Sequence, residues 1–327
     1  MISDISTPAL LVEKSIMEKN LHAMQQLADR NGIILRAHIK SHKIPELAIK
    51  QLQLGAVGIA VAKLGEAEIM AQAGIKDIQI ANIIVGKEKI ERLRKLNRQL
   101  RLTVAFDSTK NVRDLSAVFC RERKPIELLV KVNSGLNRCG IDSFPQLMRL
   151  VKRASLLKGI KIVGLMTHAG HAYAAKNKRE IKEIGDKESL LLIDYADRLK
   201  KAGYEINTIS VGSTPTAAHC AKIKGITELR VGNYIFNDMT QVALGTVPIS
   251  KCALTVLATV ISISDDKRRI VLDALVHFFV SHLLANVHHA QSDFMPQHIS
   301  FGVQLQQKAH RKAVGTRFEA APAFGEY

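Results

Sequence analysis

Residues 78 to 106 read IQIANIIVGKEKIERLRKLNRQLRLTVAF and contain one complete pattern of strand, helix and strand. Short apolar, β-branched runs predict buried strands over Ile78–Ile83 and Leu102–Phe106. Between them, apolar residues recur at three- and four-residue steps among charges, which predicts an amphipathic helix over Lys87–Arg101. Strands that alternate with helices in this way indicate a parallel sheet, because parallel neighbours need a crossover connection.

The same alternation continues on both sides of this stretch. The other predicted strands are Ile33–Ala37, Val57–Ala62, Ile126–Asn133, Ile160–Met166, Ile206–Val211 and Glu228–Val231. Further helices are predicted over Val12–Arg30 and Glu180–Ala202. Eight such strands in one chain predict an α/β fold that closes into a (β/α)8 TIM-like barrel. A doubly wound open sheet is the alternative, because strand order cannot be read from the sequence.

The pattern changes after Asn237. A β-rich run over Cys252–Ser264, a turn at Asp265–Arg268 and a strand over Arg269–Leu272 predict a β-hairpin in a second, smaller domain. This β domain is expected to be incomplete, because the strand pattern ends at about Ala274 and histidines crowd the segment that follows.

We expect the barrel to span residues 8–240 and the β domain residues 241–327, with residues 1–7 packed against the β domain. After about Ala274 the chain is expected to be truncated or aberrant. Two explanations are open: an out-of-frame tail on a truncated gene, or a native but diverged end.

Composition narrows the class of protein. A chain of 327 residues with 47% hydrophobic and 24% charged residues has the usage of a globular protein, which excludes disordered and collagen-like classes. The formal net charge of +17 favours acidic partners such as phosphates, nucleic acid or anionic membranes, but a soluble surface in a basic proteome is the preferred explanation.

The cysteines and the apolar segments indicate a cytoplasmic protein. Four cysteines lie far apart without a CxxC pair, so neither a zinc finger nor a disulfide framework is predicted. The first residues do not resemble a secretory signal. The apolar segment Val271–Val287 is interrupted by polar residues and is shorter than the roughly 20 residues of a spanning helix, so we expect no membrane segment.

Polar residues follow several predicted strands, where TIM barrels carry their reactive groups. The segments are Arg36–Lys43, Asn133–Arg138, Thr167–Tyr173, Gly212–Thr216 and Gly232–Tyr234. In the last two, glycine with hydroxyl or amide residues predicts a phosphate site, although turn glycines alone would give the same pattern. Lys40 is placed to form a Schiff base with a cofactor aldehyde; the alternative is a solvated surface charge.

These segments resemble the fold-type III pyridoxal-phosphate (PLP) enzymes, most closely the D-threonine aldolase and eukaryotic-type D-serine dehydratase family. Thr7–Leu10 resembles the family's opening strand, and Leu35–Lys43 resembles its cofactor-lysine motif. The resemblance continues through Asn133–Gly140, Thr167–Tyr173, Ser210–Thr216 and Arg230–Asp238. It covers most of the chain, roughly Thr7 to Ala274.

The resemblance implies PLP as the cofactor, with Lys40 bound to its aldehyde. The implied cofactor residues at the phosphate end are Ser213, Thr214, Gly232, Asn233 and Tyr234. Arg138 would lie near the phenolic oxygen and His168 near the ring. Arg230 would approach the pyridine nitrogen, as in alanine racemases of the same fold, and Tyr173 would lie on the substrate side. The expected catalytic residues are therefore Lys40, Arg138, His168 and Tyr173.

The implied activity is a PLP-dependent lyase acting on D-configured β-hydroxy amino acids. Cleavage of Cα–Cβ would give glycine and an aldehyde, whereas loss of the β-hydroxyl would give a keto acid and ammonia. The resemblance also implies a homodimer. A catalytically weak or inactive PLP-binding protein of the same fold is the alternative.

The family's divalent metal, zinc or manganese, is held by a late His together with Asp or Cys two residues later. This sequence contains no His-x-Cys and no late His-x-Asp; His298, for example, is followed by Ile299 and Ser300. No metal ligand is therefore assigned, and the spacing of His282, His288 and His289 presents no tight pair.

Nucleic-acid binding is a third hypothesis and is supported by charge alone. The basic stretch Lys87–Arg101 has no interleaved aromatic residue, and tryptophan is absent from the chain. Few aromatic side chains are therefore available to stack on nucleic-acid bases, and we expect no nucleic-acid partner.

Overall fold

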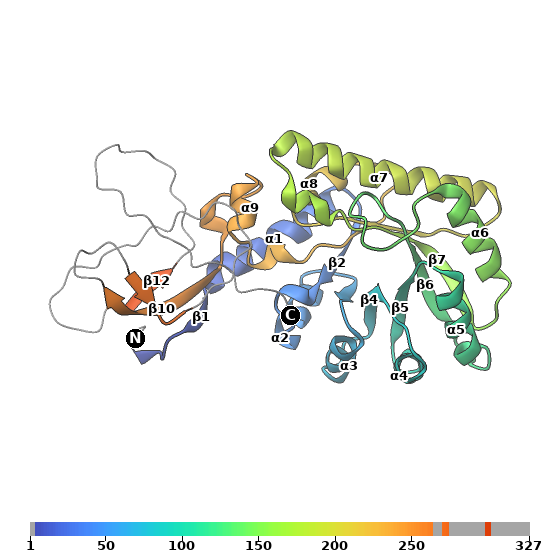
Figure 1. The fold of residues 1–327 in the computed structure, drawn as a ribbon, viewed down its shortest axis with the longest axis horizontal. Helices are drawn as coiled ribbons and strands as arrows, with labels where there is room; N and C mark the ends of the chain where they lie inside the picture. Colours follow the sequence, from blue (N-terminus) through green and yellow to red (C-terminus); the bar gives the residue numbers. More distant parts are fainter. Residues whose placement is uncertain (1–3, 264–269, 275–297, 302–327) are drawn as a thin grey trace. The chain divides into compact units, whose positions relative to one another are not determined.

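Eight parallel strands form a closed barrel in the computed structural model, which describes residues 4–263, 270–274 and 298–301 (Figure 1). The strands follow one another around the barrel as β2 (Ile34–His38), β3 (Gly58–Val61), β4 (Asp77–Ile83), β5 (Arg101–Phe106), β6 (Ile126–Lys131), β7 (Ile160–Met166), β8 (Thr208–Val211) and β9 (Glu228–Leu229). Closure comes from β9, where Glu228 and Leu229 pair with Ile34 and Leu35 of β2. The predicted barrel is confirmed, and the open-sheet alternative is wrong.

Helices connect the strands and surround them (Figure 1). They are α1 (Lys14–Arg30), α2 (Pro45–Gln53), α3 (Leu64–Gln72), α4 (Lys87–Asn97), α5 (Thr109–Phe119), α6 (Phe144–Ser155), α7 (Lys178–Lys201) and α8 (Ala217–Cys220). Short 3-10 helices are η2 (Ile39–Ser41), η3 (Gly170–Ala174), η4 (Asn233–Ile235) and η5 (Ile249–Lys251). Among the described residues, no helix has both the length and the apolar character needed to cross a membrane.

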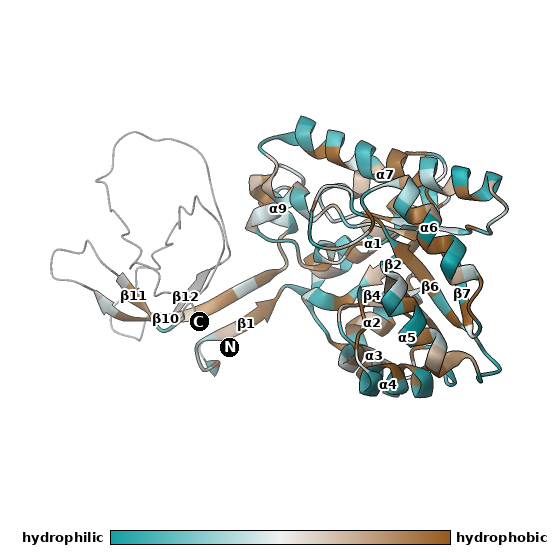
Figure 2. Cartoon of the chain, turned by 45° about the vertical axis from the view of Figure 1, so that its right-hand side comes forward, coloured by the Kyte–Doolittle hydropathy of each residue, from teal (hydrophilic) through white to brown (hydrophobic). Residues whose placement is uncertain are grey.

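The strands form because they are covered on both faces. Ile80, Val104 and Leu128 are fully buried, as expected of parallel strands between a filled barrel interior and an outer layer of helices. Figure 2 shows the hydrophobic colour on β6 and β7 and much hydrophilic colour along α7. Several predicted boundaries differ by one or two residues from the observed ones. The largest difference is in the helix predicted over Lys87–Arg101, which ends at Asn97, because Arg101 starts β5 and pairs with Asp77 of β4.

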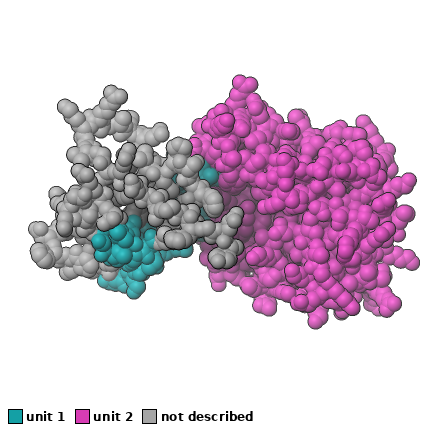
Figure 3. Space-filling model, in the orientation of Figure 1, with its two compact units in different colours: residues 1–17, 236–242, 247–327 teal, residues 18–235, 243–246 magenta. Residues whose placement is uncertain are grey.

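The chain divides into two compact units (Figure 3): residues 18–235 with 243–246, which hold the barrel, and residues 1–17, 236–242 and 247–327. The second unit also contains α9 (Met239–Ala243) for most of its length. The predicted limits of 8–240 and 241–327 stay a prediction.

The second unit contains a small antiparallel sheet. Its order is β1 (Ala9–Val12), β10 (Leu254–Ile263) and β11 (Ile270–Leu272), with β12 (His298–Phe301) also paired to β10. The antiparallel pairing of β10 with β11 confirms the strand pair expected from the sequence. The predicted turn at Asp265–Arg268 lies outside the described residues.

The described residues do not test the predictions about the end of the chain. The segment that follows Ala274, with His282, His288 and His289, lies outside the described residues except for the four residues of β12.

Candidate active site

The end of β2 places Lys40 on the short helix η2. His38 caps this helix, because its Nδ1 accepts a hydrogen bond from the Lys40 backbone N–H at 3.3 Å. Two further bonds attach the same turn to the segment after β9: the His38 N–H donates to Val231 O at 2.7 Å, and the Ser41 hydroxyl donates to Gly232 O at 2.8 Å. The lysine turn and the last glycine turn are thus held together.

Four predicted site residues influence one another's pKa values or add charge at this end of the barrel: Lys40, Arg138, His168 and Arg230. Lys40 is exposed to solvent, but its pKa is lowered. Desolvation is the largest cause, and the charges of Arg230 and Arg138 lower the pKa further. Burial lowers the pKa of His168 to about 3, with Arg230 and Lys40 adding to the effect. Lys40 therefore has an increased share of neutral amine, and His168 is neutral at ordinary pH.

The segment that carries Arg138 is held by Asn133. Its Oδ1 accepts the backbone N–H groups of Gly135 at 3.1 Å and Asn137 at 3.0 Å, and its Nδ2 donates to Asp142 at 2.7 Å. Asn137 has a φ of +54°, a left-handed conformation that asparagine tolerates better than most residues. These bonds give the loop after β6 a defined conformation, with Arg138 exposed on it.

The two predicted phosphate turns bring the backbone close to its neighbours. Gly212 has a φ of +110°, and a Cβ there would lie 2.9 Å from Leu229 Cδ1. A Cβ at Gly232 would lie 2.6 Å from the His38 carbonyl oxygen. Both turns therefore need glycine.

Within residues 212–216 and 230–234, two buried polar atoms have no hydrogen-bond partner among the described residues. They are the Thr214 hydroxyl oxygen and Arg230 Nε. Another nitrogen of the buried Arg230 guanidinium donates to Thr167 O. Buried donors without acceptors are costly, so acceptor groups from a ligand would fit here.

The other predicted residues are placed as follows. The Tyr234 hydroxyl is buried and accepts a hydrogen bond from Gln51 Nε2 of α2 at 2.9 Å, so its phenol is already engaged by the helix layer. Asn233 starts η4, and Tyr173 lies on η3; both side chains are half-buried. Ser213 is buried and bonds to Thr216.

Residues that were not predicted also contribute. His38 is buried, and its pKa lies well below the ordinary value, chiefly through desolvation and then through Arg230. Lys131 ends β6 inside the barrel, where its Nζ donates to Ala81 O at 3.1 Å, and burial lowers its pKa. A charged residue within the apolar strand over 126–133 was the available signal for Lys131.

Glu188 and Thr216 form a buried pair behind the turn that follows β8, with 3.0 Å between their oxygens. The helical phase of α7 was the available signal, since Glu188 lies in register with the buried Ile181, Gly185 and Leu192.

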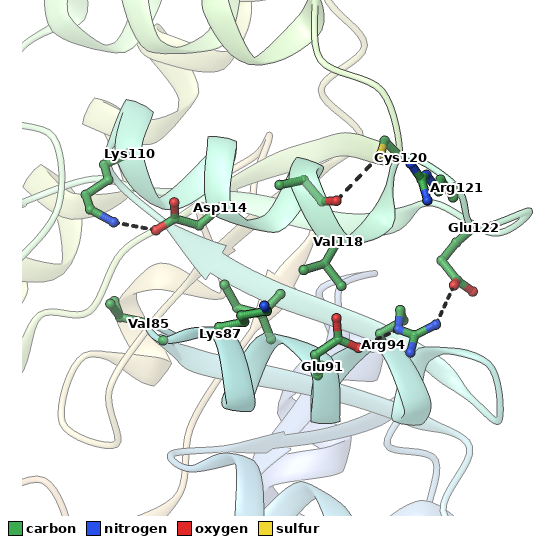
Figure 4. A pocket seen from close by; sticks show the side chains of 13 residues that line it. Val85, Lys87, Glu91, Arg94, Lys110, Asp114, Val118, Cys120, Arg121 and Glu122 are labelled. Atoms are coloured by element: carbon green, nitrogen blue, oxygen red, sulfur yellow. Dashed lines mark hydrogen bonds and ion pairs between the residues drawn. The ribbon is translucent and has the colours of Figure 1, made fainter.

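A cavity of about 850 Å³ lies elsewhere, between α4 and α5 on the outside of the barrel (Figure 4). Ion pairs Lys110–Asp114 and Arg94–Glu122 lie on its wall, with N···O distances of 2.6 and 3.1 Å. The predicted site residues do not line this cavity. A smaller cavity is lined by residues that include Lys131, Arg138 and His168.

Comparison with known proteins agrees with the arrangement of the barrel. The family described as alanine racemase, N-terminal domain, matches residues 12–239. D-threonine aldolase from Arthrobacter sp. is 34% identical over 84% of this chain and 72% of its own. D-serine dehydratase from Dictyostelium discoideum is 28% identical over 84% of this chain and 73% of its own.

Among solved structures, D-threo-3-hydroxyaspartate dehydratase from Delftia sp. HT23 superposes with a TM-score of 0.79 at 30% identity, covering 84% of this chain and 72% of that chain. These similarities confirm the resemblance found in the sequence motifs. The chain therefore belongs to the alanine racemase N-terminal domain family, among fold-type III relatives that include D-threonine aldolase and D-serine dehydratase.

Proposed function

We propose that this protein is a PLP-dependent lyase that acts on D-configured β-hydroxy amino acids. The observation that carries the proposal is the hydrogen-bonded attachment of the Lys40 turn to the glycine turn after β9, through Ser41 and Gly232. A reactive amine and a phosphate-type turn are thereby held at one end of the barrel. The relatives, named as D-threonine aldolase and D-serine dehydratases, support the reaction class.

The residues present fit PLP. An amine with a lowered pKa suits an aldehyde, because only the neutral form is nucleophilic. The unpartnered hydroxyl of Thr214 and the close approach at Gly232 suit a phosphate group. Lys40 would hold the aldehyde end, and Ser213, Thr214, Gly232 and Asn233 would hold the phosphate end.

When bound, PLP supplies a conjugated ring that accepts the electrons released at the substrate Cα. Arg230 has only donors, so a contact with the ring nitrogen requires that nitrogen to be unprotonated. His168 Nδ1 lies 3.5 Å from Gly212 O; because a carbonyl only accepts, Nδ1 carries the proton and Nε2 is the acceptor. With a pKa of about 3, His168 would orient neighbours rather than store a proton.

Within the described residues, no group of three or more His, Cys, Asp or Glu is arranged to hold a metal. The missing late His-x-Cys or His-x-Asp motif favours a second candidate function: a PLP-binding protein with weak or no turnover.

We also propose a homodimer, which gel filtration would test. Four free cysteines support a cytoplasmic location.

Reductive labelling tests the proposal directly. The PLP-loaded protein is treated with borohydride and digested, and the labelled peptide is identified; the label is expected on Lys40, with K43A as a control that stays labelled. Label on another residue, or none, would overturn both candidates.

Turnover then separates the two candidates. D-threonine and D-serine are tested after chelation and again with added manganese or zinc, with L-threonine as the stereochemical control. D-specific products support the lyase, and restoration of activity by metal would show metal dependence. Label on Lys40 without turnover of either substrate under all these conditions would favour the PLP-binding protein.

A further inference from the structure

Glu188 lies on α7, fully buried behind the turn that follows β8. Its Oε1 accepts hydrogen bonds from the Thr216 hydroxyl at 3.0 Å and from the Cys220 thiol at 3.3 Å. Its Oε2 is buried without a partner among the described residues. Burying a carboxyl group with one oxygen unpaired costs free energy. Nothing in the proposed chemistry uses this group directly.

The hydrogen bond from the Thr216 hydroxyl to Glu188 determines whether the Thr216 oxygen acts as a donor or an acceptor towards Ser213. Because the proton of Thr216 points to Glu188, its oxygen is left as an acceptor. It accepts the Ser213 backbone N–H at 3.1 Å and lies 3.1 Å from the Ser213 hydroxyl. With the Thr216 proton committed to Glu188, the Ser213 hydroxyl can only donate in this contact, so Thr216 orients it. If Ser213 turns its proton towards a phosphate it gives up this one contact, while its backbone N–H stays bonded to Thr216.

The helix approaches this turn closely because Gly185 has no side chain. A Cβ at Gly185 would lie 3.3 Å from Thr216 Cβ and 3.4 Å from His219 Cβ. One turn along α7, the Ser189 hydroxyl donates to Gly185 O at 2.8 Å. The position of Glu188 is thus set by packing and by hydrogen bonds, rather than by a flexible side chain reaching across solvent.

We propose that Glu188 is a positioning residue for the cofactor phosphate: it fixes the Thr216 hydroxyl, so that the 213–216 turn presents the hydroxyls of Ser213 and Thr214 to the phosphate. The inference rests on the proposed function, because it takes the phosphate of PLP as the ligand of this turn.

The direction of the Glu188 pKa shift agrees with this role. Burial is the largest influence and raises its pKa, although Cys220, Thr216, Arg230 and the Gly212 backbone favour the ionised form. A raised pKa increases the share of the uncharged acid, which would repel a phosphate dianion less than a carboxylate would.

The test compares two variants of Glu188 in binding of PLP and of pyridoxal, which lacks the phosphate. E188Q keeps an acceptor oxygen, whereas E188M removes it at similar size. We expect E188M to weaken PLP binding about tenfold and E188Q to stay within about threefold of wild type. Pyridoxal binding should be unchanged in both. The matched control is E183M, an exposed position on the same helix, which should alter neither affinity.

The outcomes separate the hypotheses. Equal PLP affinity in E188M and wild type, or equal losses for PLP and pyridoxal in E188M, would overturn the inference and leave the proposed function standing. A wild-type protein that binds no PLP at Lys40 would overturn the proposed function and the inference with it.

If E188M does not fold, T216V gives the same test from the other partner with a nearly isosteric change. It should weaken PLP binding and spare pyridoxal. Where both single variants fold, the double variant should lose little more than either alone, because they interrupt one chain of hydrogen bonds.

Discussion

At the scale of the residue, the candidate site carries polar atoms whose partners the protein itself does not supply. Thr214 is 8% exposed, and its hydroxyl oxygen has no hydrogen-bond partner among the described residues. Leaving such a group unpaired costs about 1 to 3 kcal/mol, which a ligand acceptor would recover. Such a cost is expected at a position that serves a ligand, which is the role we propose for Thr214.

Thr214→Val should therefore separate stability from affinity. The apo protein is expected to keep its melting temperature or to gain slightly, because an unpaired hydroxyl is replaced by a methyl group. PLP binding should weaken about fivefold to tenfold, measured by absorbance titration alongside thermal melts. T103V, at a buried threonine on β5, should leave PLP affinity unchanged. A large loss of apo stability in T214V would show that the hydroxyl has a structural partner.

At the scale of the element, close approach between neighbouring segments positions the site. Gly232 lies against the His38 carbonyl at the end of β2, and Gly159 lies against Phe119 in the loop before β7. A Cβ at Gly159 would lie 2.2 Å from the Phe119 carbonyl, and its φ of +77° adds strain. The two glycines make the same kind of contact, but only Gly232 belongs to a predicted phosphate turn.

Substituting alanine at each position should distinguish the two roles. Gly232→Ala is expected to displace the turn from the lysine-bearing segment and weaken PLP binding at least about tenfold. Gly159→Ala should lower the free energy of unfolding by about 1 to 3 kcal/mol without changing PLP affinity in the folded fraction. Urea unfolding and PLP titration on both variants measure this. Equal losses of affinity would contradict the separation.

At the scale of the whole molecule, a buried ionic network links strands across the barrel. Arg36 of β2 bonds at 2.6 Å both to Glu228 of β9 and to Asp77 of β4. The other Glu228 oxygen accepts from Gln79 at 3.1 Å and from Ser210 at 2.7 Å. Burial alone raises the pKa of Glu228, but Arg36 and the other partners outweigh it, so the pKa lies below its ordinary 4.5.

This network predicts a pH dependence of stability with a definite sign. Because the folded pKa of Glu228 is below 4.5, its contribution is fully present above that pH and is lost as pH falls through the folded value. Glu228→Gln should destabilise the protein by about 3 to 5 kcal/mol at pH 7, since Arg36 loses a buried partner. The difference from wild type should shrink below pH 4.5, measured by urea unfolding at several pH values.

E183Q, which removes an exposed carboxylate, serves as the control and should change stability by less than about 1 kcal/mol. A difference between E228Q and wild type that stays constant down to pH 3 would contradict the assignment of the effect to this carboxylate.

The sequence by itself determined the α/β class, the order of strands and helices along the chain and the candidate lysine, because periodicity and turn chemistry are local properties that a stretch such as 78–106 displays without its neighbours. It favoured a barrel over an open sheet, but the pairing of β9 with β2 decided between them. Local patterns were weaker at boundaries, where Arg101 joined β5 rather than the preceding helix, because strand pairing with Asp77 outweighed helical periodicity.

Only the tertiary structure decided which distant residues share a partner. Closure of β9 on β2 joins Arg36 to Glu228, and the packing of α7 brings Glu188 behind Thr216. It also turned the phenol of Tyr234 towards Gln51. The physical reason is that burial and hydrogen bonding between residues far apart in the chain arise only when the barrel has closed, and no local pattern specifies them.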